Sequence, residues 1–167
     1  EAPASVIVGV LSVTVTLGLL PLAVAQWQPV RWEQVGWLAC VAGGNAWALP
    51  AGALILALHG WLVERSARGW AFMVLAALLG LAMDLGWQRL GLLEFHGTLG
   101  AGIPPWLVVL WLLFATTFAH SLAWLHERLA LAALLGAVLG PLSYVAGVEL
   151  GAATTRFPLW QLALAMA

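Results

Sequence analysis

The stretch Gly69–Trp87 reads GWAFMVLAALLGLAMDLGW and decides the fold class. Its 19 residues contain one charged side chain, Asp84. A helix needs about 20 largely apolar residues to cross roughly 30 Å of hydrocarbon, so we interpret this stretch as a membrane-spanning helix. A transmembrane β-strand would instead alternate apolar and polar residues over about 10 positions, and this run is continuous.

The composition extends this interpretation to the whole chain. Of its 167 residues, 63% are hydrophobic and 8% are charged, whereas soluble domains carry about 25% charged residues. In lipid the outer surface can be as apolar as the core, and helices satisfy their own backbone hydrogen bonds. We therefore predict an all-α protein: a polytopic transmembrane helical bundle of five to six spans, with residues 1–167 as a single membrane domain.

The expected spans follow the apolar runs: residues 4–25, 35–63, 69–87, 106–125 and 129–152, and a partial helix over 157–167. The first run ends in Ala23-Val24-Ala25, which resembles a signal-peptidase site, but no basic region precedes it, so a retained span is favoured. Because Gly43-Gly44-Asn45 and Pro50 interrupt the second run, it is either one long kinked helix or a short interfacial helix followed by a span over 47–63.

Charge gives little information on orientation. The chain has no lysine and a net charge of −1, so no nucleic-acid surface is expected. With these spans, three arginines fall on each side: Arg65, Arg68 and Arg128 on one, and Arg31, Arg89 and Arg156 on the other. The positive-inside rule cannot decide between equal numbers. The paired arginines of the Glu64–Arg68 loop favour a cytoplasmic position for that loop.

Familiar catalytic and metal-binding patterns are absent from the sequence. It contains no Gly-x-Ser-x-Gly, no His-Glu-x-x-His and a single cysteine, Cys40. We therefore expect no metal and no cofactor.

Asp84 is the strongest candidate for a functional group, because an ionisable side chain inside a membrane is costly. Gly80, Asp84 and Gln88 recur at every fourth position and share one helix face. The carboxyl could carry a proton, bind a metal or act as a general base. The alternative is a structural carboxyl that pairs with an arginine or a hydroxyl and holds helices together.

A second polar stripe lies on the helix expected over 106–125. Thr117, His120, Ser121 and Trp124 fall on one face, which should point into the bundle. His120 and Ser121 are candidate catalytic residues and Thr117 a candidate for substrate binding. The alternative is hydrogen bonding between helices. Asp84 and His120 are expected at opposite membrane faces, so an Asp–His dyad is not predicted.

Two further residues are candidates for substrate binding. Asn45 follows the Gly-Gly break, where it could instead cap the helix that begins there. Tyr144 lies on a glycine stripe of the span over 129–152.

That stripe predicts helix packing. Gly136 and Gly140, and again Gly147 and Gly151, form pairs of small residues four apart, which let two helix backbones approach closely. The partner helix could belong to this chain, to a second copy or to another membrane protein. Pro141 should kink the helix.

Four segments resemble a small family of bacterial inner-membrane proteins of unknown function. They are Gly36–Gly44 (GWLACVAGG), Leu79–Asp84 (LGLAMD), Trp111–Leu122 (WLLFATTFAHSL) and Gly140–Gly147 (GPLSYVAG), and the resemblance covers about residues 37–153. It implies a location in the bacterial inner membrane. It lends no catalytic residues.

Two functions remain open. The first is an accessory or structural membrane component that packs with a protein partner or with itself. The alternative is a small intramembrane enzyme or carrier for a lipid-like substrate, with Asp84, His120, Ser121 and Asn45 around its cavity and residues 85–105 as an interfacial lid. A closed bundle with these side chains paired favours the first, and a cavity on which two or more of them converge favours the second.

Overall fold

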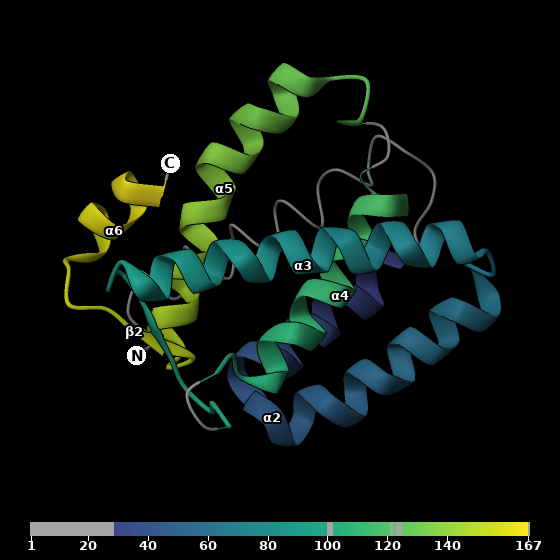
Figure 1. Ribbon diagram of the computed structural model, residues 1–167, viewed down its shortest axis with the longest axis horizontal. Helices are drawn as coiled ribbons and strands as arrows, with labels where there is room; N and C mark the ends of the chain where they lie inside the picture. Colours follow the sequence, from purple (N-terminus) through teal and green to yellow (C-terminus); the bar gives the residue numbers. More distant parts are fainter. Residues whose placement is uncertain (1–28, 100–101, 121, 123–124, 167) are drawn as a thin grey trace.

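The computed structural model describes residues 29–99, 102–120, 122 and 125–166 (Figure 1). The expected span over 4–25 therefore lies outside the described residues. The elements are α2 (Pro29–Leu62), α3 (Ala67–Arg89), β1 (Glu94–Phe95), α4 (Pro105–His120), α5 (Leu129–Glu149), β2 (Ala153–Thr154) and α6 (Leu159–Met166). The described chain is thus helical apart from two strands of two residues each, which confirms the predicted helical class.

By length and composition alone, three of the described helical stretches could cross a membrane: Gly36–Leu62, Ala67–Arg89 and Leu129–Glu149. The apolar part of α4, Pro105–Ala119, is shorter. Large apolar side chains cover the outside of these helices, and Leu75, Leu79 and Leu134 are each about 60% exposed. So continuous an apolar exterior is unfavourable in water and suits a lipid environment. Both observations support a membrane protein.

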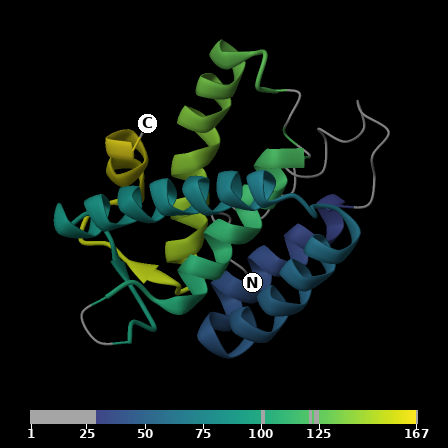
Figure 2. The same cartoon turned by 45° about the vertical axis from the view of Figure 1, so that its right-hand side comes forward.

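Helix α2 is a hairpin of two helical limbs, residues 29–43 and 45–62. The break is at Gly44, whose backbone torsions are φ 54° and ψ −153°. This conformation is almost restricted to glycine. A Cβ built on Gly36 would lie 3.1 Å from Cδ1 of Ile55, whereas in a straight helix these residues would be about 28 Å apart. The limbs are therefore antiparallel, as Figure 2 shows, and the run does not continue in one direction.

The hairpin changes the expected distribution of arginines. Because α2 turns back at Gly44, its first residues lie beside its last ones, at the end of the molecule where the 63–66 turn leads into α3 (Figures 1 and 2). The start of α2, which carries Arg31, therefore lies on the side of the 63–66 turn rather than opposite it. With the other arginines kept on the sides that the expected spans give them, the expected equal split becomes four to two.

Helix α4 packs between α2 and α3 (Figure 1). Glycines on both neighbours make room for it: a Cβ on Gly52 of α2 would overlap Val109, and one on Gly80 of α3 would overlap the ring of Trp111. Cys40 and Ala48 of α2 are fully buried in the same core. Small residues on α2 and α3 thus let the backbone of α4 come close, as is common between helices in membranes.

The C-terminal ends of α3 and α5 are tied together. Each helix ends at a glycine with positive φ, Gly91 (71°) and Gly151 (78°). In each case the two N–H groups that follow the helix bond back to its last carbonyls, Leu92 to Trp87 and Ala152 to Gly147 among them. This is the Schellman arrangement. It directs both chains into the antiparallel pair β1–β2, so the C-terminal ends of α3 and α5 meet, although the two helices are steeply inclined to each other (Figures 1 and 2).

Candidate functional site

A cavity of about 340 Å³ lies between α3, α4 and α5 and reaches α2 and the β1–β2 pair. Among the described residues α5 packs mainly on α6 and β2 and makes few contacts with α3 and α4, so space remains between these three helices. Leu93 and Phe95 line the cavity at the end where the β1–β2 pair lies, and both are buried. Part of the predicted 85–105 lid therefore forms one end of this cavity.

The lining is apolar and rich in aromatic rings. Seven lining residues are aromatic: Trp37, Phe95, Trp106, Trp111, Phe114, Phe118 and Tyr144. The others are mostly aliphatic residues and glycines, with Ser143 among them. Asp84 is the one residue of the described lining that can carry a charge near neutral pH.

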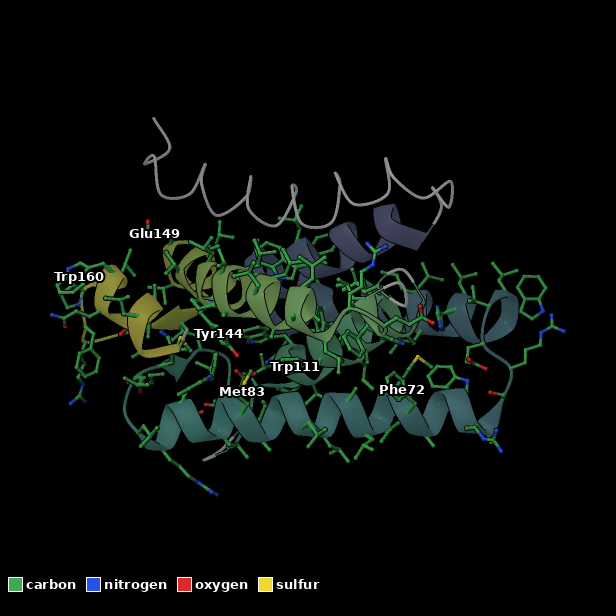
Figure 3. The ribbon with its side chains drawn as sticks, turned by 90° about the horizontal axis from the view of Figure 1, so that it is seen from above. Phe72, Met83, Trp111, Tyr144, Glu149 and Trp160 are labelled. Carbon is green, nitrogen blue, oxygen red and sulfur yellow. The ribbon has the colours of Figure 1, made fainter. Side chains whose placement is uncertain are left out.

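Asp84 holds three helices together at this cavity. Its side chain comes from α3 and is 1% exposed. The indole Nε1 of Trp111, on α4, donates to Oδ2 at 2.5 Å, and the hydroxyl of Tyr144, on α5, donates to Oδ1 at 2.5 Å. Figure 3 shows Tyr144 and Trp111 beside Met83, which precedes Asp84, between α3 and α5. Of the two structural pairings predicted for this carboxyl, an arginine or a hydroxyl, the structure shows the hydroxyl.

The predicted face of α3 explains how Trp111 reaches the carboxyl. Gly80 lies one turn before Asp84, and the Trp111 ring occupies the space that a side chain at position 80 would fill. Trp111 was not among the candidate residues predicted from the sequence. A signal was present, because a tryptophan in the middle of an apolar run needs an acceptor for its N–H.

Ser143 was also missed. It lines the cavity beside Tyr144, and its hydroxyl donates to the carbonyl of Gly140 at 2.7 Å. That bond is local to α5, and the oxygen keeps acceptor capacity on the cavity side.

The structure describes only part of the polar stripe predicted on the helix over 106–125. Thr117 is buried, and its hydroxyl donates to the carbonyl of Leu113 at 3.3 Å, one turn back in the same helix. Such a bond satisfies the hydroxyl locally. The side chains of His120, Ser121 and Trp124 lie outside the described residues, so their predicted roles stay predictions.

Asn45 caps a helix other than its own. Its Oδ1 accepts from the backbone N–H of Trp106 at 3.0 Å, and its Nδ2 donates to the carbonyl of Gly97 at 2.7 Å. Trp106 is the second residue of α4, where an N-cap side chain normally binds. Pro104, which precedes the helix, has no side-chain acceptor, so the tip of the α2 hairpin supplies one. Both ends of the amide are engaged, which favours a structural role over substrate binding.

The glycine stripe of α5 faces the cavity. Gly136, Gly140 and Gly147 line it, and a Cβ at any of them would meet no described atom within 4 Å. Within the described chain these glycines widen the cavity, and no helix backbone packs on them. Gly151 has the separate role of ending α5.

The chemistry available at this site is that of a buried hydrogen-bonding anchor. No group of three or more metal-ligating side chains occurs among the residues the structure describes. Asp84 presents two oxygens, each of which accepts from one neutral donor and keeps a further lone pair. Along α4, His120 lies nine residues beyond Trp111, or about 13 Å of helix rise.

Residues 26–167 match a family described as "Protein of unknown function (DUF2878)", and the chain belongs to this family. The match extends beyond the 37–153 of the resemblance at both ends. No curated protein and no solved structure matches the chain.

Proposed function

We propose that this member of the DUF2878 family is a multi-pass membrane protein that binds a lipid-like molecule in the cavity between α3, α4 and α5. The observation that carries the proposal is the convergence of Asp84 and Tyr144 on a cavity whose remaining lining is almost entirely apolar. Ligand sites of about 300–1,000 Å³ commonly combine an apolar wall with a few placed polar groups.

The apolar wall suits a hydrocarbon chain. Water in such a space would find few partners, since a buried water needs two to four polar neighbours. A ligand chain that replaces it would contact the aliphatic and aromatic residues of α4 and α5. Asp84 would then bind the polar end of the ligand and fix its depth.

The geometry favours binding or carriage over catalysis. Bond-breaking chemistry usually needs a second acid, base or nucleophile within hydrogen-bond reach of the first. The Tyr144 hydroxyl and the Trp111 indole both donate to Asp84. The distance of His120 along α4 supports the expectation that it does not join Asp84 in a dyad.

We place the protein in the bacterial inner membrane with its four-arginine end in the cytoplasm. The positive-inside rule counts arginines in short loops near span ends, and the four-to-two distribution now favours this orientation. Helices α3, α4 and α5 would each cross the membrane, and the α2 hairpin would enter the membrane and return to the same side. Residues 4–25 remain a predicted span. A cysteine at Ser66 should react with a membrane-impermeant maleimide only in opened or inverted vesicles. Labelling in intact cells would reverse the orientation.

Native mass spectrometry of the protein in its own membrane lipids tests ligand binding. The unmodified chain should retain one lipid-like molecule through gentle activation. Gly140→Leu should lose it, because the new side chain enters the cavity. The matched control is Gly86→Leu, a glycine of α3 that lines no part of the cavity and whose Cβ would also meet nothing within 4 Å. Equal retention by both variants would reject the cavity as the binding site.

An accessory role is the second candidate. The open glycine stripe of α5 favours it, because nothing in the described chain packs on Gly136 or Gly140. A helix of a partner protein or of a second copy would cover that stripe. A stoichiometric protein partner or a dimer in the same mass spectra, lost in Gly136→Leu, would select this role over ligand binding.

A further inference from the structure

We infer that the polar end of the ligand is cationic, such as the ammonium group of an amphiphilic amine, and that the cavity discriminates against anionic lipids. This inference rests on the proposed ligand binding and specifies its chemistry. It starts from the charges and rings around the cavity.

The charged groups of the cavity lining favour a cationic ligand. The described lining contains one carboxyl, Asp84, and no lysine, arginine or histidine. A phosphate or carboxylate head would lie beside Asp84 in apolar surroundings, and two like charges at such a distance repel strongly. An ammonium head would provide the opposite charge and N–H donors for the lone pairs that the Asp84 oxygens keep.

The aromatic rings of the lining also favour a cationic ligand. Cations bind over the faces of tryptophan, tyrosine and phenylalanine, and the attraction increases when water is excluded. The ring of Trp111 hydrogen-bonds to Asp84 and contacts Phe114 edge-on, with ring centroids 5.6 Å apart. Tyr144 hydrogen-bonds to the other carboxyl oxygen. A carboxyl held between two lining aromatic residues is the environment in which an organic cation is best stabilised.

A purely structural role would leave Asp84 poorly compensated. Its two described partners, Trp111 and Tyr144, are neutral donors. The two hydrogen bonds from these donors to an ionised carboxylate are charge-assisted, but they leave its net charge without a counter-ion among the described lining residues. Joining three helices could be achieved by a neutral glutamine or serine at lower cost. A cationic ligand would supply what the side chains here do not.

Two probes of nearly the same shape and opposite charge test the inference: tetraphenylphosphonium and tetraphenylborate. Binding is measured by equilibrium dialysis with the full chain in nanodiscs of zwitterionic lipid, and empty nanodiscs correct for partition into lipid. The phosphonium should bind at least about tenfold more tightly than the borate. Asp84→Asn should remove that preference, whereas Glu149→Gln, which removes a carboxylate that does not line the cavity, should keep it.

The comparison of probes on the unmodified chain needs no variant, so a misfolded Asp84→Asn protein does not obscure the result. Equal binding of the two ions, or tighter binding of the borate, would overturn the inference. A neutral probe, N-phenyl-1-naphthylamine, separates this failure from that of the proposed function. If the neutral probe binds and Gly140→Leu blocks it, ligand binding stands and only the charge preference falls. If no probe binds, both proposals fail.

Discussion

Replacing Gly80 by alanine should loosen the junction between α3 and α4 and release Asp84 from Trp111. A Cβ at position 80 would overlap three atoms of the Trp111 ring, Cε3, Cδ2 and Cζ3. Ordinary carbon–carbon contact is at about 3.5 Å, so the ring would have to move by about 1 Å. Moved away from α3, the indole nitrogen would leave its 2.5 Å contact with the carboxyl and reach the limit of hydrogen bonding.

The cost has two parts. Overpacking of a well-packed core costs about 1–3 kcal/mol. A hydrogen bond between membrane helices contributes about 0.6 kcal/mol on average. The expected loss of unfolding free energy is therefore about 1.6–3.6 kcal/mol. Gly86→Ala is the matched control on the same helix, because its Cβ would meet nothing within 4 Å. The control should be neutral or slightly stabilising, since alanine is the better helix former.

Two measurements check this prediction. Reversible unfolding in bicelles by steric trapping gives the free-energy difference between the variants. The indole N–H resonance of Trp111 in ¹⁵N-tryptophan-labelled protein, assigned with Trp111→Phe, should move upfield in Gly80→Ala and stay in place in Gly86→Ala. Equal stability of the two variants together with an unchanged Trp111 resonance would refute the steric argument.

Substitutions at three other positions test separate features of the fold. Tyr144→Phe removes one donor to the buried carboxyl and should lower the unfolding free energy by about 0.6–1.7 kcal/mol; steric trapping would contradict this if it shows no loss. Asn45→Ala should cost about 1 kcal/mol and Asn45→Asp less, because aspartate keeps the capping oxygen; equal losses would assign the cost to the bond with the carbonyl of residue 97. Gly44→Ala should cost about 1–3 kcal/mol because its backbone conformation excludes a Cβ. Double electron–electron resonance between spin labels at Leu38 and Leu54 reports the hairpin. In the chain that keeps Gly44, a distance near 24 Å between these positions would mean a straight helix.

The helices that arise from a single uninterrupted apolar run could be predicted from the sequence. The expected span over 69–87 corresponds to α3 at Ala67–Arg89, and the span expected to begin at residue 129 begins there in α5. Both follow from apolar length, which depends on local sequence. The end of α5 at Glu149 reflects the backbone conformation of Gly151, a local signal that the packing interpretation of that glycine had obscured.

The hairpin and the complete site were harder to predict from the sequence, because both depend on contacts between residues far apart in the chain. Gly43-Gly44 predicts a break in α2, but the reversal depends on packing against α4 and on the bond from Asn45 to Trp106. Asp84 could be identified from the cost of an ionisable group in lipid, and Tyr144 was a candidate. Their pairing across 60 residues follows from the tie between the ends of α3 and α5, which no spacing in the sequence encodes.

The α2 hairpin has a consequence for the biogenesis of the protein. Its tip carries backbone groups and an asparagine amide whose partners are Gly97 and Trp106, more than 50 residues later in the chain. Because both partners follow the tip in the chain, the tip is made before them and has no place in hydrocarbon until they join it. The hairpin should therefore wait at the membrane surface or within the insertion machinery and enter the bilayer only with α4, so that insertion and folding of this half of the protein are a single event.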